Sequence, residues 1–181
     1  MTILETERLI LRDYRKSDLR DLHRLLSDKK TMYFLDELAT NTLEETKSNL
    51  ETAIANADGH YFCICGKATG SFTGSMGYTV TAATPLGKVA HLGYFLLPEH
   101  HRQGYAPEAA KRVLEFAFTQ DNCVRITTAC YRENDPSRKV MERAGLRKEG
   151  ERIRAQYHGG AMKDRLEYAL NKDEWEAMHC I

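Results

Sequence analysis

One segment constrains the fold of this chain more than any other: a strand, a polar loop with a central glycine and a helix follow one another directly. Val89 to Leu97 is the most strand-like stretch, and it ends at Pro98. A helix is expected from about Pro107 to Thr119, because proline is favourable in a first helical turn. The loop His101 to Ala106 therefore leads into a helix N-terminus, where unpaired N–H groups and the helix dipole attract anions.

The loop itself is suited to a pyrophosphate. Gly104 has no Cβ and lets the backbone approach a ligand closely. Ala106 is small for the same reason, and Arg102 can add positive charge at the rim. From spacing alone, an anion site and an ordinary strand-to-helix connection both stay open.

The rest of the sequence alternates between strand and helix periods. The order is a strand, two helices, three strands, a helix, a strand, a helix and two strands. This order indicates one domain over residues 1–181, of α+β or mixed α/β class, with a mostly antiparallel sheet of about seven strands and about four helices. Strands are expected at 6–12, 60–65, 74–80, 89–97 and 124–131, with two more within 147–170 that join near 158–160.

Several helix ends carry capping residues. Ser17 is expected to cap the first helix, and Thr42 with Glu45 forms a capping-box pattern before the second. The second helix is expected to end at Ala57-Asp58-Gly59. Gly145 is expected as the left-handed residue after the helix that begins at Asp135-Pro136. The apolar side of the second helix would consist of Leu43, Leu50 and Ile54.

Composition narrows the class of protein. The 26 Lys+Arg balance the 26 Asp+Glu, which argues against nucleic-acid or membrane binding through bulk charge. No secretory signal and no membrane-spanning apolar run is recognised. Cys63 and Cys65 would share one strand face, and no metal-site spacing accompanies them. An odd number of cysteines without a CxxC pair favours reduced thiols in a cytoplasmic protein: Cys63, Cys65, Cys123, Cys130 and Cys180.

Four segments together resemble the GCN5-related N-acetyltransferase (GNAT) family, in particular its RimJ/RimL-like branch of ribosomal-protein N-terminal acetyltransferases. The resemblance covers nearly the whole chain in the right order. It is carried by Thr6–Arg12, by His91–Pro98 with Arg102–Ala109, by Asn134–Leu146, and by Asp164–Leu170 followed by Trp175.

The resemblance implies a GNAT fold that uses acetyl-CoA as co-substrate and needs no metal. The sheet would splay between residues 89–97 and 124–131, with a β-bulge near Gly93–Leu96. Pantetheine would pair with main chain near Phe95, Leu96 and Leu97, and Asn134 would hydrogen-bond it. Ser137 would lie near the thioester sulfur. The pyrophosphate would be held by the loop residues Arg102, Gln103, Gly104, Tyr105 and Ala106.

Two positions depart from the family pattern. Met141 stands where many relatives have a tyrosine that protonates the leaving thiolate, so that role would pass to Ser137, to Tyr131 or to solvent. His91 stands where relatives often carry a glutamate, and a histidine is a competent base at neutral pH. His91 is either that base or a half-buried strand residue. Ser137 either contacts the sulfur or serves only in capping.

The acceptor is less defined. Met32, Tyr33 and Phe34, with Tyr157 and His158, could border it or simply pack. Asp36 and Glu37 could hold a cationic amine or be solvated. The developing oxyanion would meet an N–H near Phe95 or Leu96.

The predicted function is transfer of acetyl from acetyl-CoA to a primary amine by direct attack in a ternary complex. A non-catalytic acyl-CoA sensor on the same fold is the alternative. A homodimer is compatible with the family. No phosphate-binding or dinucleotide-binding glycine motif supports a nucleotide-binding protein.

Overall fold

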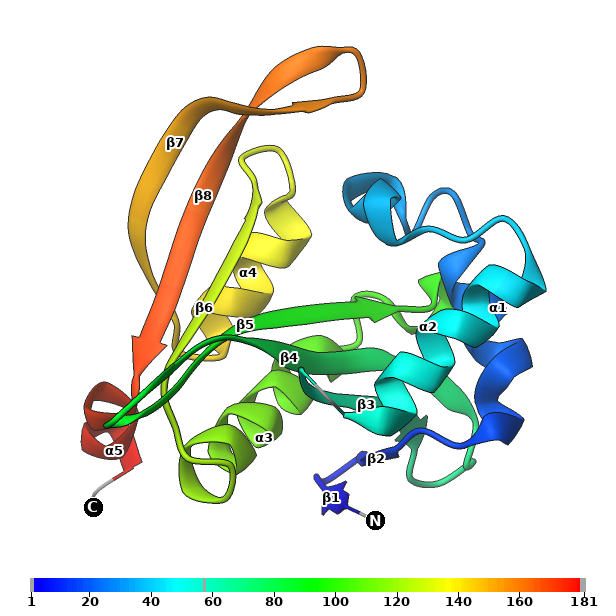
Figure 1. The fold of residues 1–181 in the computed structure, drawn as a ribbon, viewed down its shortest axis with the longest axis horizontal. Helices are drawn as coiled ribbons and strands as arrows, with labels where there is room; N and C mark the ends of the chain where they lie inside the picture. The colour runs from blue at the N-terminus through cyan, green and yellow to red at the C-terminus, as the bar shows by residue number, and fades with distance from the viewer. Residues whose placement is uncertain (1, 57, 180–181) are drawn as a thin grey trace.

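The computed structural model describes residues 2–56 and 58–179, and these form one eight-stranded mixed α/β sheet with helices on both faces (Figure 1). The strand order is β1-β2-β3-β4-β5-β6-β8-β7. The strands are β1 Ile3–Glu5, β2 Leu9–Asp13, β3 Gly59–Gly66, β4 Phe72–Thr84, β5 Gly87–Leu96, β6 Cys123–Tyr131, β7 Arg147–His158 and β8 Ala161–Asn171. The α-helices are α1 Leu19–Leu26, α2 Leu43–Ala55, α3 Tyr105–Thr119, α4 Asp135–Arg143 and α5 Lys172–His179; 3-10 turns are η1 Lys16–Asp18, η2 Tyr33–Leu38 and η3 Pro98–His100.

The sheet is antiparallel except at one junction. β5 and β6 run parallel, and their ladder extends only to the pair His91 and Thr127. Beyond that pair the two strands diverge, as Figure 1 shows. The expected α+β class and the splay between these two strands are therefore confirmed.

The two faces of the sheet have separate cores, because side chains alternate along a strand. Phe62 and Ile64 of β3 pack with α3 and α4. Cys63 and Cys65 point to the other face, where they pack with α1 and α2. Their Sγ atoms lie 3.8 Å apart, so the expectation that they share one face is confirmed.

Turn and capping predictions were correct where a local motif determined them. Thr42 and Glu45 form the capping box of α2, and Gly145 has a φ of 96° after α4. The hairpin of β7 and β8 turns at Gly159-Gly160, as expected, and projects beyond the rest of the sheet (Figure 1). Asn56 closes α2 in a left-handed conformation; of the residues expected to end this helix, Ala57 lies outside the described residues.

Other expectations were wrong. The first strand is divided into β1 and β2, so that residues 6–8 lie outside both strands. Ser17 does not cap α1, whose N-cap is Asp18. Of the three apolar residues expected to face inward from α2, only Leu50 is buried; Leu43 and Ile54 share its side of the helix but lie at the two helix ends, where they are 46% and 37% exposed.

The sheet also differs from the family expectation. β5 pairs with β4 in continuous register from Gly93 to Leu96, and the register shift falls between Val80 and Ala82 of β4 instead. The ladder therefore has no bulge at Gly93–Leu96. The sequence also did not predict α5, whose Trp175 packs 5.7 Å from Phe118 between ring centroids.

Within the described residues, no helix is both long and apolar enough to cross a bilayer, and no group of three metal-ligating side chains comes together.

Candidate active site

A cavity of about 560 Å³ lies between the loop before α3 and the first turns of α4. Its cationic side chains are Arg102, Lys139 and Arg143, joined by His100 and His101. The one carboxylate in its lining, Asp135, is paired with Arg138 at 3.0 Å. The cavity therefore offers uncompensated positive charge to an anionic ligand.

The backbone of the loop is shaped for the same purpose. Arg102 has a φ of 60° and Gly104 a φ of 80°, and α3 begins immediately afterwards at Tyr105. Left-handed residues next to a helix N-terminus gather N–H groups into an anion-binding concavity. A left-handed arginine costs about 1 kcal/mol, and such strain is typical of functional loops. This arrangement supports the pyrophosphate site predicted for Arg102, Gly104, Tyr105 and Ala106.

The N-terminal segment holds this loop in place. Arg8 donates to the carbonyl oxygen of Gln103 at 2.9 Å and to Glu108 at 2.7 Å. The Arg8 guanidinium also lies 4.8 Å from the centre of the Tyr105 ring. Thr6 donates to the same carboxylate at 2.5 Å, and these contacts lower the pKa of Glu108 although burial opposes the shift. Thr6 and Arg8 belong to a segment that resembles the family, but nothing in the sequence indicated that they contact Gln103 and Glu108.

Where β5 and β6 diverge, two threonine side chains of β6 bond to the main chain of β5. Thr127 and Thr128 donate to the carbonyl oxygens of Ala90 and Leu92, at 3.2 and 3.0 Å. From there to Leu96 no ladder pair joins the two strands among the described residues. His101 Nε2 donates to the carbonyl oxygen of Leu96 at 2.9 Å, so this loop histidine ties the loop to the end of β5.

The first turn of α4 holds Asn134 and Ser137. Asn134 Oδ1 accepts from the backbone N–H of Ser137 at 3.2 Å, so this asparagine caps the helix. Tyr94 reaches Ser137 from β5 and donates its hydroxyl hydrogen to the Ser137 carbonyl oxygen at 3.0 Å, so the Ser137 hydroxyl, 2.8 Å away, donates to Tyr94. Burial raises the pKa of Tyr94 well above its usual range. Met141, one turn further along α4, is fully buried in the core.

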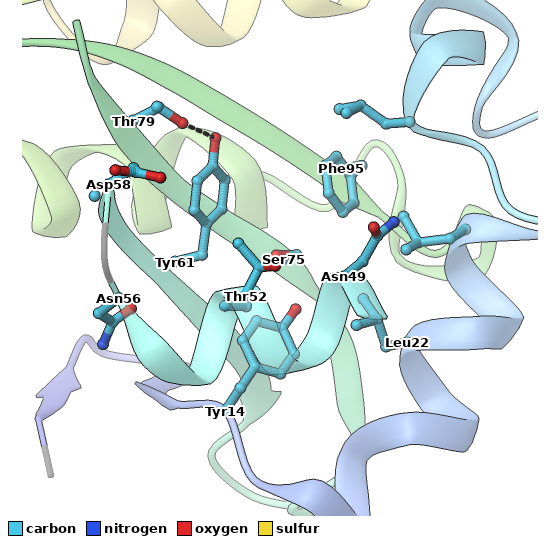
Figure 2. Close-up of a pocket in the computed structure, with 14 residues that line it drawn as sticks. Tyr14, Leu22, Asn49, Thr52, Asn56, Asp58, Tyr61, Ser75, Thr79 and Phe95 are labelled. Atoms are coloured by element: carbon cyan, nitrogen blue, oxygen red, sulfur yellow. Dashed lines mark hydrogen bonds between the residues drawn. The ribbon is translucent and has the colours of Figure 1, made fainter. Parts of the chain in front are cut away.

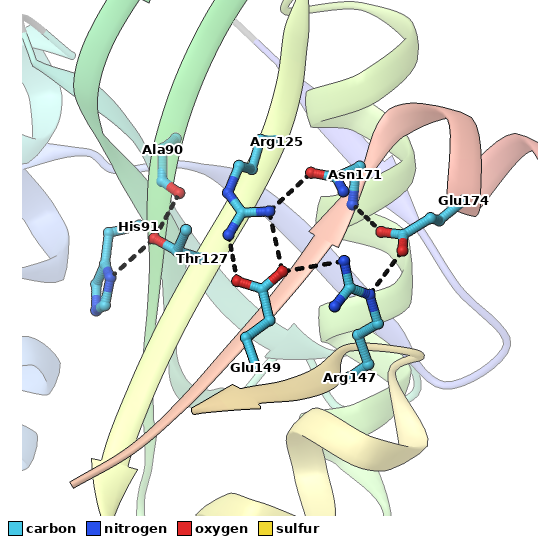
Figure 3. A network of polar contacts seen from close by, with 8 residues as sticks. All are labelled: Ala90, His91, Arg125, Thr127, Arg147, Glu149, Asn171 and Glu174. Carbon is cyan, nitrogen blue, oxygen red and sulfur yellow. Dashed lines mark hydrogen bonds and ion pairs between the residues drawn. The ribbon is translucent and has the colours of Figure 1, made fainter. Parts of the chain in front are cut away.

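His91 lies on β5 at the last paired position before the splay (Figure 3). Its Nδ1 is 3.3 Å from the Thr127 hydroxyl. Because that hydroxyl donates its hydrogen to Ala90, it accepts from His91 Nδ1–H, and the lone pair is then on Nε2. Burial, with a smaller contribution from Arg165, lowers the pKa of His91.

Tyr131 lies in an aromatic cluster at the end of β6. Its ring stacks on His158 with centroids 4.8 Å apart and lies 5.7 Å from Phe34, while Arg165 covers it at 4.7 Å. Tyr33 meets His158 edge to face, which joins η2 to the β7–β8 hairpin. Tyr157, in contrast, is 70% exposed.

A second cavity, of about 330 Å³, lies on the opposite face of the sheet, below α1 and α2 (Figure 2). Phe95 lines this cavity, whereas its neighbour Leu96 lines the cationic one. Adjacent residues of a strand point to opposite faces, so the end of β5 separates the two cavities.

Of the ten predicted cofactor-binding residues, five line the cationic cavity: Leu96, Arg102, Gly104, Tyr105 and Ala106. Asn134 and Ser137 lie next to its lining residues Asp135 and Pro136 at the start of α4, and Phe95 lines the other cavity. Gln103 is held by Arg8 and by its own bond to Glu99, and it does not line the cavity. Leu97 is buried with α1 and α2. The residues missed by the sequence reasoning are Arg8, Tyr94, Lys139 and Arg143.

Comparison with known proteins shows the family of this chain. Residues 8–147 match the family described as Acetyltransferase (GNAT) domain. YoaA of Bacillus subtilis, an uncharacterised N-acetyltransferase, is 29% identical over 94% of this chain and 97% of its own. The chain belongs to the GNAT family and is an acetyl-CoA-dependent N-acetyltransferase.

Two solved structures share the fold. A GNAT-family acetyltransferase from Bacillus anthracis is 26% identical, with a TM-score of 0.83, over 96% of this chain and 100% of that one. RimL, a ribosomal L7/L12 alpha-N-protein acetyltransferase solved with coenzyme A, is 22% identical with the same TM-score, over 96% and 99% of the two chains.

Proposed function

We propose that this chain transfers the acetyl group of acetyl-CoA directly to a primary amine, with both substrates bound at once. The observation that carries the proposal is the pair of cavities on opposite faces of one strand, one cationic and one without lysine, arginine or histidine, which are lined by the adjacent residues Leu96 and Phe95. Two substrates that approach the same point from opposite sides gain from proximity and orientation.

The cationic cavity fits CoA. The N–H groups of Gly104, Tyr105 and Ala106 would hold the pyrophosphate, with Arg102 and Lys139 adding charge. Asn134 uses its Oδ1 in capping, so its Nδ2 would donate to pantetheine. Acetyl-CoA supplies an activated acyl group: the amine nitrogen bonds to the acetyl carbon, the carbon–sulfur bond breaks, and CoA leaves as a thiolate.

His91 is the proposed proton acceptor, because an amine attacks only when neutral. Along β5 it lies on the same face as Phe95, roughly 13 Å away at the usual rise per residue. This separation favours a route through water rather than direct contact. The Thr127 contact leaves Nε2 unprotonated, and the lowered pKa keeps His91 neutral at pH 7.

Ser137 is the proposed donor to the thiolate. The Tyr94 hydroxyl donates to the Ser137 carbonyl oxygen at 3.0 Å, so the Ser137 hydroxyl donates to Tyr94 at 2.8 Å, and this contact would position it to turn its hydrogen toward the thiolate. Tyr131 stays the weaker candidate, because its contacts are with the aromatic cluster at the end of β6.

The proposed oxyanion donor is the N–H of Leu96. The carbonyls of Ala90 and Leu92 accept from β6, so the main-chain groups of alternate residues face the gap between the strands. Leu96 continues that alternation, whereas Phe95 faces β4. Of the two positions expected from the sequence, Leu96 is therefore favoured.

Release of free CoA thiol from acetyl-CoA, measured with a panel of primary amines, tests the proposal. Amine-dependent release is expected. Tight acetyl-CoA binding with no release across the panel would instead support the sensor alternative.

We further propose that residues 1–181 form a single domain of the RimJ/RimL-like branch, located in the cytoplasm. The likeness to RimL and the buried, unpaired state of Cys63, Cys65, Cys123 and Cys130 support this; Cys180 lies outside the described residues. A homodimer is also proposed from the family resemblance, and light scattering would test it.

A further inference from the structure

We propose that the cavity below α1 and α2 selects the acceptor by binding an uncharged group that carries a hydrogen-bond-accepting oxygen. The inference rests on the proposed amine acetylation and specifies the class of amine. The cavity has a volume of about 330 Å³, which suits a group of amino-acid side-chain size.

The charge of the lining argues for a neutral ligand. Its residues include no lysine, arginine or histidine, and Asp58 is its one carboxylate. A polyamine carries several positive charges and would need several carboxylates to replace its hydration. An acidic group would find no cation. The walls are apolar where α1 and the end of η2 contribute them: Leu22, Leu26 and Leu38.

A buried hydroxyl gives the cavity its polar specificity. Tyr14 is 5% exposed, and its hydroxyl has no partner at normal hydrogen-bond distance among the described residues, although the Ser75 hydroxyl approaches it closely enough to act on its pKa. In Figure 2 this hydroxyl points between Asn49 and Ser75 into the cavity. Ser75 is also buried, at 2% exposure. An unpartnered buried hydroxyl costs stability, which a ligand oxygen would recover by accepting its hydrogen.

The other end of the cavity leads toward the proposed chemistry. Phe95 of β5 forms the wall at this end. Thr79, whose hydroxyl lies 3.3 Å from that of Tyr61, also lines the cavity and pairs with His91 in the sheet register. A ligand with its neutral group near Tyr14 could therefore present its amine on the face of β5 that carries His91.

Amides of glutamine, lysine and glutamic acid provide a matched test, because their side chains are similar in length but differ in charge. We expect kcat/KM for glutamine amide to exceed that for the other two, and for spermidine, by about tenfold or more. Tyr14→Phe should raise the KM for glutamine amide about tenfold while leaving leucine amide, which has no side-chain oxygen, unchanged.

Tyr78→Phe is the matched control, since it removes the hydroxyl of a buried β4 tyrosine that bonds to Asp121 outside the cavity. Equal use of charged and neutral amides, or no effect of Tyr14→Phe, would overturn the inference while leaving amine acetylation intact. Calorimetry of glutamine amide in the presence of CoA keeps the test independent of turnover. Binding that Tyr14→Phe weakens supports the inference even if no amine is acetylated, and absence of binding overturns it.

Discussion

At the scale of single residues, the chemistry depends on which atom of each side chain is left for a substrate. Thr127 fixes the tautomer of His91, and the capping role of Asn134 uses its Oδ1. The sequence identified His91 and Asn134 but not these atoms. The partner of His91, Thr127, is 36 residues further along the chain, so no local sequence pattern could predict the contact.

Replacement of His91 by alanine should lower kcat roughly a hundredfold, as expected for loss of a general base. Only neutral His91 accepts a proton, so activity is retained above its pKa and lost as pH falls below it. Because burial lowers that pKa, the acid limb of the kcat profile should lie below the ordinary histidine value of 6.5. A pH profile at saturating substrates measures this limb, which should be absent in His91→Ala.

Thr127→Val should displace the acid limb and lower kcat, whereas Thr127→Ser should restore both, because serine keeps the accepting oxygen. If the valine variant instead retains the wild-type pH profile, Thr127 does not position His91.

Loss of the Ser137 hydroxyl in Ser137→Ala should lower kcat roughly a hundredfold, and Tyr94→Phe roughly tenfold. If Tyr94 acts by positioning the Ser137 hydroxyl, the double variant should be no slower than Ser137→Ala alone. Strictly additive losses, measured as kcat at saturating acetyl-CoA, would show that they act separately.

At the scale of elements, helix caps show where local sequence suffices. The capping box at Thr42 forms as its motif predicts, whereas Ser17 lies in η1 and does not cap α1. Thr42→Ala should therefore reduce the free energy of unfolding by about 1 kcal/mol. Ser17→Ala, the matched control, should change it by less than about 0.5 kcal/mol. Urea denaturation measures both, and equal losses would contradict the assignment.

The loop before α3 depends on a contact made from the N-terminal segment. Arg8→Ala removes its bonds to Gln103 and Glu108, and should raise the KM for acetyl-CoA roughly tenfold with little change in kcat. Arg152→Ala, which removes an exposed ion pair on β7, should leave that KM unchanged. A similar KM in both variants would mean that the loop keeps its shape without Arg8.

The sequence predicted much of the fold because strand alternation and turn residues are local. It failed where an element has a second function. Residues 6–8 look like the start of a strand but leave the sheet to bind Glu108, 100 or more residues away. Tyr94 looks like an ordinary strand aromatic, and only the packing of β5 against α4 brings it to Ser137.

At the scale of the whole molecule, the splay of β5 from β6 determines the function. It opens one strand end to both faces of the sheet, with a cationic cavity on the α4 side and a neutral one on the α1 and α2 side. Neither cavity alone accounts for acetyl transfer. Their position on either side of Phe95 and Leu96 does, because an amine and the acetyl group bound there would approach the same strand end and could react without a covalent enzyme intermediate.

Two-substrate initial-rate kinetics tests this claim most directly. With an amine identified by thiol release, double-reciprocal plots at several fixed amine concentrations should intersect, and the intact mass of the protein incubated with acetyl-CoA alone should remain unchanged. Parallel lines together with a stably acetylated protein that passes its acetyl group to the amine would contradict direct transfer in a ternary complex.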